Sequence, residues 1–282
     1  MTESAMDTGG SAGTGSDIVV YGSSRAWVHF DSQIMEDELA LSTYNLGIDG
    51  HNFWLQYLRH QTLLKYNKKP KAIILSVDVF SLQKRSDLYN YNQFLPYMLY
   101  STDLYRFTNS YNGFNYWDYN IPLLRYNGKI KAINEALKNA LYPKNLDLGR
   151  KKGFKGIKKV WNTDLEEAKK KSPHYEIALD TPSIGLFENF LEECKEKNIQ
   201  VIMVYAPEYI EGQSYVINRK EIISYFENYS NIHDIPFIDY SGNVICTKKE
   251  YFYNSLHLNK KGAERFTNLL ITDIKKYKYL DD

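Results

Sequence analysis

DIVVYGSSR, at residues 17–25, is the stretch of sequence that decides the fold of this chain. The four apolar residues from Ile18 to Tyr21 are too few for a helix and end in Gly22, which favours a strand followed by a tight turn. Ser24 stands on that turn, where the chain passes from the strand toward a helix. A serine in this position exposes its hydroxyl at the edge of a sheet, near a helix N-terminus. Ser24 is therefore a candidate nucleophile.

The segments that follow this turn alternate between helix and strand patterns. The first group comprises a helix at 31–41, a strand at 43–45, a helix at 51–66 and a strand at 72–77. The second group comprises a helix at 183–197, strands at 199–205 and 236–239, and helices at about 219–228 and at 260–276. Strands that alternate with helices form a mostly parallel sheet. We therefore predict an α/β domain with a five-stranded parallel sheet.

The composition limits the classes of protein to which this chain can belong. Its 282 residues suffice for one large core, and its 43% hydrophobic and 24% charged residues are typical of a globular protein. A net charge of +1 offers no basic excess for neutralising phosphates, so we expect no nucleic-acid partner. No apolar run long enough for a transmembrane helix occurs in the sequence. Cys194 and Cys246 have no metal-ligand spacing and are expected to be buried thiols, although a pairing between them stays open.

Residues 1–16, MTESAMDTGGSAGTGS, are small, polar and rich in glycine and serine. They have neither the basic start nor the apolar stretch of a signal peptide, so we predict a disordered tag or linker. The folded domain is expected to span 17–282. A leader or anchor that preceded it in the natural protein would not be visible in this sequence.

Two further segments carry candidate site residues. NLGIDG, at residues 45–50, follows the second strand, and its glycines let a backbone N–H approach a substrate as an oxyanion hole requires. YNSLHLN, at residues 253–259, lies directly before the last helix and contains His257, a candidate general base. Ligands of open α/β sheets bind at the carboxyl ends of the strands, where these segments are expected to meet.

The order of the three segments is more specific than any one of them. Gly-x-Ser follows the first strand, Gly-x-x-Gly follows the second, and x-x-x-His-x-Asn precedes the last helix. In this order the chain resembles the SGNH, or GDSL-like, hydrolase superfamily over nearly all of residues 17–80 and 183–276. Its Gly-Ser-Ser-Arg-Ala block is most similar to that of SGNH-like proteins of cell-envelope polysaccharide O-acetylation. The resemblance implies a flavodoxin-like three-layer α/β/α sandwich.

The resemblance also implies a role for each segment. Ser24 would be the nucleophile, and the N–H groups of Ser24 and Gly47 would form the oxyanion hole. His257 would be the general base, with Asn254 in the place of the triad aspartate. The implied activity is that of a serine acyl hydrolase or acyltransferase on O-acyl, in particular O-acetyl, esters of a polysaccharide or on another small ester. The resemblance further implies no metal and no cofactor, a location in the cell envelope, and a membrane acyltransferase as a partner.

Two positions depart from the family pattern. The third block, usually Gly-x-Asn-Asp, is SVDV at residues 76–79, so the asparagine donor of the oxyanion hole is missing. We expect Asp78 to bind a neighbouring N–H or Arg25. Asn254 can orient the imidazole of His257 but cannot stabilise its charged form. In a serine protease the exchange of aspartate for asparagine lowers turnover by about 10⁴, mainly through the wrong tautomer.

Asn254 leaves three alternatives open. The site is a slow Ser–His dyad, or it takes a carboxylate from elsewhere, for which Asp239 at the end of the fifth strand is a candidate. In the third alternative the protein is a non-catalytic or degenerate glycan-binding protein on the same fold. A further alternative is that asparagine was introduced at position 254 by engineering. Arg25 is expected to brace the turn through Asp49 or Asp78, or to bind a substrate carboxylate.

Residues 82–175 interrupt the alternation without a clear strand, and we predict a largely helical insertion there. Its part from Tyr89 to Tyr126 is aromatic, which suits either an irregular packed cap or stacking on sugars. Between Leu141 and Tyr175 ten basic residues occur against four acidic ones. They indicate a solvated face, or an attraction to an anionic polysaccharide or membrane surface. An insertion between the third and fourth strands should overhang the carboxyl edge as a lid does.

Overall fold

The five segments predicted as strands form one sheet in the computed structural model, which describes residues 15–89, 91–99, 101–141 and 149–280. The strands are β1 (Ile18–Tyr21), β2 (Thr43–Asn45), β3 (Ala72–Val77), β4 (Gln200–Tyr205) and β5 (Phe237–Asp239). All neighbouring strands run parallel, in the order β2-β1-β3-β4-β5. The predicted five-stranded parallel sheet is confirmed. Residues 1–14 of the expected linker lie outside the described residues, so that expectation stays a prediction.

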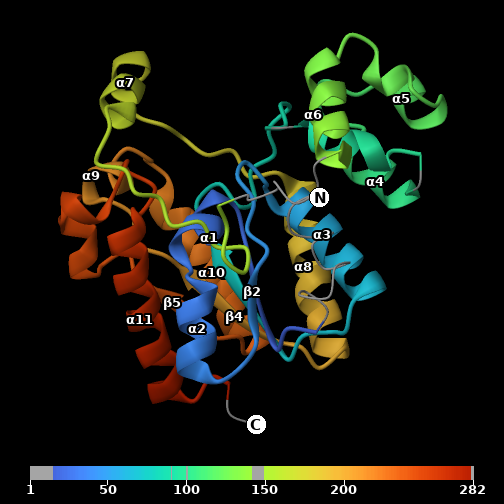
Figure 1. Ribbon diagram of the computed structural model, residues 1–282. Helices are drawn as coiled ribbons and strands as arrows, with labels where there is room; N and C mark the ends of the chain where they lie inside the picture. The colour runs from blue at the N-terminus through green and yellow to red at the C-terminus, as the bar shows by residue number, and fades with distance from the viewer. Residues whose placement is uncertain (1–14, 90, 100, 142–148, 281–282) are drawn as a thin grey trace.

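Helices cover both faces of the sheet (Figure 1). One face carries α3 (Phe53–Tyr66), α8 (Thr181–Glu196) and α10 (Arg219–His233). The other carries α1 (Ser24–His29), α2 (Ser32–Leu39) and α11 (Lys260–Tyr277). Successive strand residues point to opposite faces, so Val19 packs with the first set of helices and Val20 with the second. The predicted three-layer α/β/α sandwich is confirmed.

Side-chain caps explain where several of these helices begin. Asp31 accepts the backbone N–H groups of Gln33 and Ile34 at the start of α2, and Asn259 accepts the N–H of Gly262 at the start of α11. Helix α8 begins at Thr181, two residues earlier than expected. Asp180 caps it by accepting the Ser183 N–H at 2.9 Å, and a proline occupies its first turn, where the missing N–H costs nothing.

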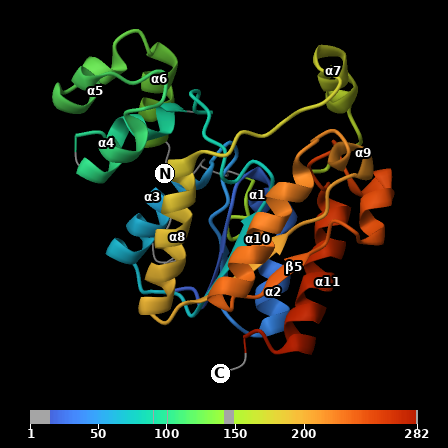
Figure 2. The same cartoon turned by 180° about the vertical axis from the view of Figure 1, so that it is seen from behind.

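The described part of the insertion is largely helical. It contains η2 (Tyr91–Tyr97), α4 (Thr102–Thr108), α5 (Tyr116–Asn120), η3 (Leu124–Tyr126), α6 (Ile130–Leu141) and α7 (Asp164–Lys171). Two opposite views show α4, α5 and α6 grouped on one side of the molecule and α7 on the other (Figure 1, Figure 2). Leu280, which follows α11, and Asp17, just before β1, line one hollow at the end of the molecule opposite the insertion helices. The parallel strands therefore begin at that end, and their carboxyl ends point toward the insertion helices.

Two sets of aromatic side chains in the insertion differ in exposure, one buried and one exposed, while a third, with Tyr91, Tyr97 and Phe114, is partly buried. Phe94, Phe107, Tyr111 and Tyr119 are at most 8% exposed, and the Tyr105 ring meets that of Tyr119 edge-on at 4.9 Å. These rings fit the packing interpretation. A second set stays exposed and available for stacking on a sugar: Tyr89, Tyr116 and Trp117.

The basic segment that follows is partly tied to the domain. Lys152 forms an ion pair with Glu36, and Lys169 forms one with Glu211 at 3.4 Å. The Lys169–Glu211 pair is exposed, so it contributes little to stability and fits a solvated face. An attraction of this segment to an anionic polymer stays a prediction.

Cys194 and Cys246 are both free and buried, as the sequence favoured. Burial raises the pKa of the Cys246 thiol to about 11, so the group stays protonated near neutral pH. Within the described ranges, no cluster of His, Cys, Asp and Glu suits a metal ion, and no helix is long and apolar enough to cross a bilayer.

Candidate active site

The turn after β1 places Ser24 at the carboxyl edge of the sheet. Gly22 adopts φ +148°, and a Cβ atom there would lie 2.7 Å from Cβ of Ala26 and 2.9 Å from Cβ of Ser76. Only glycine fits this close passage without displacing its neighbours. Ser24 is the first residue of α1, so its N–H has no partner within the helix.

His257 meets Ser24 across the edge of the sheet. Its Nε2 lies 2.7 Å from Oγ of Ser24, although 233 positions separate the two residues. The loop that carries it is fixed on both sides: Tyr253 N–H donates to the carbonyl of His257 at 3.0 Å, and Leu258 N–H donates to Nε2 of His29 at 3.0 Å. The structure thus brings the predicted nucleophile and base into hydrogen-bond contact.

Asn254 determines which nitrogen of His257 carries the proton. Its Oδ1 accepts the backbone N–H groups of Leu256 at 3.1 Å and His257 at 2.9 Å. Backbone N–H groups only donate, so this atom of the amide must be the carbonyl oxygen. The same oxygen lies 2.9 Å from Nδ1 of His257, which therefore carries the hydrogen. The lone pair of Nε2 is then directed at the Ser24 hydroxyl, as a general base requires.

The surroundings of His257 favour its neutral form. Burial lowers the pKa of the imidazole to about 3, the charge of Arg25 acts in the same direction, and Asp164 opposes both. The ring of Tyr253 stacks on the imidazole, with centroids 5.3 Å apart and an interplanar angle of 7°. The base is consequently unprotonated near neutral pH.

Asp78 supports the serine turn. This buried carboxylate accepts the Ser23 hydroxyl at 2.8 Å through Oδ2 and the Phe80 N–H at 2.8 Å through Oδ1. Asp78 was expected to bind a neighbouring N–H or Arg25. The contact with the Phe80 N–H is observed, and Arg25 is not a hydrogen-bond partner of Asp78. Asp78 therefore holds the residue next to the nucleophile rather than replacing the missing asparagine donor.

The oxyanion role expected for Gly47 needs correction. Its N–H donates to Oδ1 of Asn45 at 2.8 Å and is thus occupied. Asn45 in turn donates to the carbonyl oxygens of Ala26 and Phe30, so this buried amide ties β2 to α1. A Cβ atom at Gly47 would overlap the backbone nitrogen of Trp27. Gly47 is required for close packing of α1.

Arg25 braces the site, but not through the expected carboxylates. It is buried, donates to the carbonyl of Ala206 and lies 3.4 Å from Oε2 of Glu208. Glu208 also accepts from Arg219 at 2.7 Å and from the Tyr205 hydroxyl at 2.8 Å. The partner of Arg25 is therefore Glu208, which follows β4, and neither Asp49 nor Asp78. A buried guanidinium needs such a partner because its desolvation is otherwise uncompensated.

The carboxylate that contacts the Asn254 side chain is Asp164 and not the expected Asp239. Asp239 is exposed and accepts the Ser241 N–H at 2.7 Å and hydroxyl at 2.9 Å, so the suggestion that it completes the triad is wrong. Instead, Nδ2 of Asn254 donates to Oδ2 of Asp164 at 3.2 Å. Asp164 belongs to the insertion, where no motif pointed to it.

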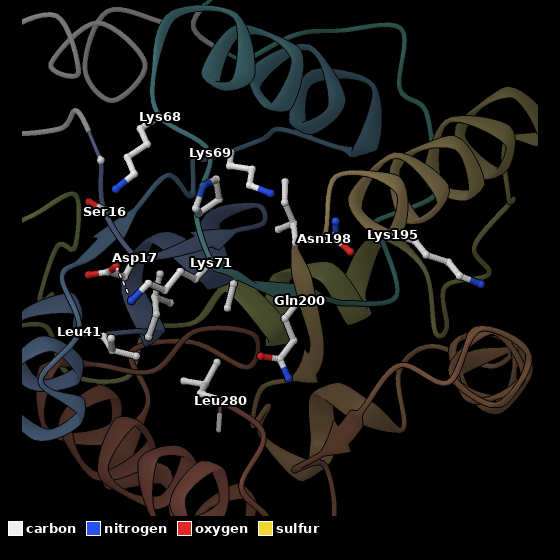
Figure 3. A pocket seen from close by; sticks show the side chains of 15 residues that line it. Ser16, Asp17, Leu41, Lys68, Lys69, Lys71, Lys195, Asn198, Gln200 and Leu280 are labelled. Carbon is white, nitrogen blue, oxygen red and sulfur yellow. Dashed lines mark ion pairs between the residues drawn. The ribbon is translucent and has the colours of Figure 1, made fainter. Parts of the chain in front are cut away.

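A small cavity of about 230 Å³ adjoins Ser24. Its lining combines the candidate catalytic pair with a polar and charged rim that includes Asp49, Asn52, Arg85, Asp87 and Tyr111. A larger hollow of about 760 Å³ lies at the opposite edge of the sheet, among lysines near the starts of β1 and β3 (Figure 3). It contains no serine–histidine pair, so the smaller cavity is the candidate active site.

No protein-family model and no curated protein matches this chain. The solved structures that are similar to it include three with a TM-score of 0.43. A provisionally assigned acylhydrolase from Bacteroides fragilis is 13% identical, with 92% of this chain and 86% of that chain covered. A GDSL-like lipase from Bacteroides thetaiotaomicron is 12% identical, with 92% and 88% covered. A Streptococcus pneumoniae protein provisionally described as a platelet activating factor is 12% identical, with 97% and 88% covered. Likenesses at this level carry no argument about activity, which has to be drawn from the residues of the site.

Proposed function

We propose that this protein is a serine acyl hydrolase or acyltransferase of the SGNH type that acts on O-acyl, in particular O-acetyl, esters of a polysaccharide. The observation that carries the proposal is the chain of contacts from Ser24 through His257 to Asn254. Ser24 supplies a hydroxyl on a strand-to-helix turn, and the neutral imidazole of His257 directs its lone pair at that hydroxyl. Asn254 accepts the hydrogen on the other ring nitrogen and so selects the tautomer.

The chemistry follows from this arrangement. Ser24 Oγ attacks the ester carbonyl carbon while its proton passes to Nε2 of His257. The imidazolium then gives the proton to the departing alcohol, which leaves an acyl group on Ser24. Water resolves this intermediate in hydrolysis, and a sugar hydroxyl resolves it in transfer. Of the two N–H groups expected to bind the oxyanion, that of Ser24 at the start of α1 is unoccupied by a helix partner and that of Gly47 is bound to Asn45. Loss of one donor of an oxyanion hole lowers the rate by about 10²–10³. We therefore infer a slow enzyme.

The cavity supports a small acyl group on a polar alcohol. Its volume of about 230 Å³ is smaller than the ~300–1,000 Å³ of pockets that hold drug-sized ligands. Its rim carries charged and amide side chains that suit a polar alcohol, and Phe80 and Leu256 add apolar surface that suits a short acyl group. An acetylated sugar fits both properties. The cell-envelope location, periplasmic or extracytoplasmic, and a membrane acyltransferase partner rest on the family resemblance alone.

Ester turnover tests this proposal. Aryl acetate, butyrate and octanoate should be hydrolysed with decreasing kcat/KM, and Ser24→Ala and His257→Ala should reduce the acetate reaction to background. Release of acetate from an O-acetylated polysaccharide should depend on Ser24 in the same way. A glycan-binding protein without catalysis would instead bind the polysaccharide, release no acetate and behave identically with Ala at position 24.

A further inference from the structure

We propose that Asp164 is a positioning residue of this active site, which holds the Asn254 amide and supplies the negative charge that the triad lacks. The inference rests on the proposed serine chemistry and extends it to the insertion. Four residues form an unbroken donor–acceptor sequence: Oδ2 of Asp164 accepts from Asn254, Oδ1 of Asn254 accepts from His257, and Nε2 of His257 faces the Ser24 hydroxyl.

The carboxylate acts on His257 through the amide between them. A hydrogen bond to an ionised acceptor is stronger than a neutral one, so Asp164 fixes the orientation of the Asn254 side chain. Chains of hydrogen bonds polarise one another, and a carboxylate on Nδ2 draws the amide toward a more negative Oδ1. That oxygen becomes a better acceptor for the Nδ1–H of His257. The imidazolium that forms when Ser24 loses its proton is stabilised accordingly.

Backbone contacts hold Asp164 at this point. The segment 149–163 leads to it and is tied to the domain at successive places: Lys155 N–H donates to Trp27 O at 3.1 Å, Lys260 N–H to Ile157 O at 2.8 Å, and Asn162 N–H to Tyr253 O at 2.9 Å. The last of these contacts joins the segment to the residue beside Asn254. The N–H of Asp164 donates to Oδ1 of Asn162 at 3.2 Å, and the first turn of α7 favours a negative charge at its start.

The pair also accounts for an asparagine in the place of aspartate. An Asn254→Asp exchange would put a second carboxylate against Asp164, at a contact that is now 3.2 Å. Two carboxylates that close repel each other, and each raises the pKa of the other. Asn254 therefore complements Asp164, and the exchange alone would not produce a stronger triad.

Four variants test this inference: Asp164→Asn, Asn254→Asp, the double variant, and Glu166→Gln as a control. Glu166 is exposed in the same first turn, so its variant removes the same charge from the same helix. We expect Asp164→Asn to lower kcat/KM for an aryl acetate about 3- to 5-fold at low salt, as for exposed charged pairs. At 1 M salt the difference should shrink, because the screening length falls to about 3 Å. Asn254→Asp should not exceed the unmodified protein, whereas Asn254→Asp with Asp164→Asn should exceed Asn254→Asp.

The inference is overturned if Asp164→Asn equals Glu166→Gln at both salt concentrations and the double variant equals Asn254→Asp. Labelling of Ser24 by a fluorophosphonate in the unmodified protein separates this failure from failure of the proposed function. A readout without turnover completes the test: the downfield proton resonance of the His257 Nδ1–H should move upfield in Asp164→Asn and stay in place in Glu166→Gln. An unmoved resonance in both variants contradicts the role of Asp164, whatever the activity of the protein.

Discussion

Oδ1 of Asn254 lies 2.9 Å from Nδ1 of His257 and simultaneously accepts the backbone N–H of that same residue. This double contact fixes the amide and, through it, the tautomer of the base. The penalty described for asparagine in serine proteases arises mainly from the wrong tautomer. Here the backbone donors exclude that tautomer, so an asparagine is compatible with catalysis at this position.

Asn254→Ala should lower kcat/KM for an aryl acetate by about 10²-fold or more, toward the ~10⁴ seen when the wrong tautomer prevails. Without the amide, nothing among its present contacts selects the Nδ1–H form. Steady-state kinetics measure the effect, with Asn268→Ala as the control because the side chain of that exposed asparagine donates to the carbonyl of Glu264 within α11. Equal activity of Asn254→Ala and the unmodified protein would contradict the role of Asn254.

The activity should persist to acidic pH. The neutral form of His257 is the base, and it is present above the pKa of the group, which burial lowers to about 3. An unperturbed histidine would lose half of the activity near pH 6.5. We expect kcat/KM to stay constant from pH 8 down to at least pH 5 and to fall as the pH approaches 3. A half-loss near pH 6.5, with circular dichroism unchanged, would show that the site does not keep the imidazole neutral.

Gly47→Ala should destabilise the domain by about 1–3 kcal/mol, as overpacked sites do. The added Cβ would overlap the backbone of α1, which carries the nucleophile. Urea unfolding measures the change. Gly185→Ala in α8 is the matched control, because a Cβ there meets nothing within 4 Å. If Gly47→Ala loses activity at unchanged stability, the assignment of its N–H to the oxyanion would have to be restored.

Arg25→Met should cost about 3 kcal/mol, the lower end of the range for broken buried ion pairs, because Glu208 keeps Arg219 and Tyr205. Removal of the Arg25 charge should also raise the pKa of His257 and move the acid limb of the activity to higher pH. Thermal unfolding and a pH–rate profile measure the two effects. Arg265→Met on the surface of α11 serves as control and should change neither; a stable Arg25→Met would mean that the ion pair contributes nothing.

The sheet could be predicted because its strands are short apolar runs between helical patterns. Residues 18–21, 72–77 and 201–205 are buried on both faces, so their composition alone separates them from the amphipathic helices around them. In the insertion, the bounds of the individual helices could not be predicted in the same way. Its buried rings, such as Phe94 and Tyr119, pack among short helices that have no long period.

The candidate site was predictable only where a residue follows a strand or precedes the last helix. Ser24 and His257 occupy such positions. Glu208 follows β4 and would have been found by the same rule. The state of the Gly47 N–H depends on the side chain of Asn45, which a motif does not reveal. Asp164 reaches the site by a long segment of the insertion, and its position follows from tertiary contacts alone.

The central claim, that Ser24 is an activated nucleophile, is tested most directly by covalent labelling with a fluorophosphonate, followed by peptide mapping. We predict one adduct on Ser24, absent in Ser24→Ala, much slower to form in His257→Ala, and unaffected in Ser32→Ala. Failure of the unmodified protein to form an adduct on Ser24, or labelling at an equal rate in His257→Ala, would contradict the account.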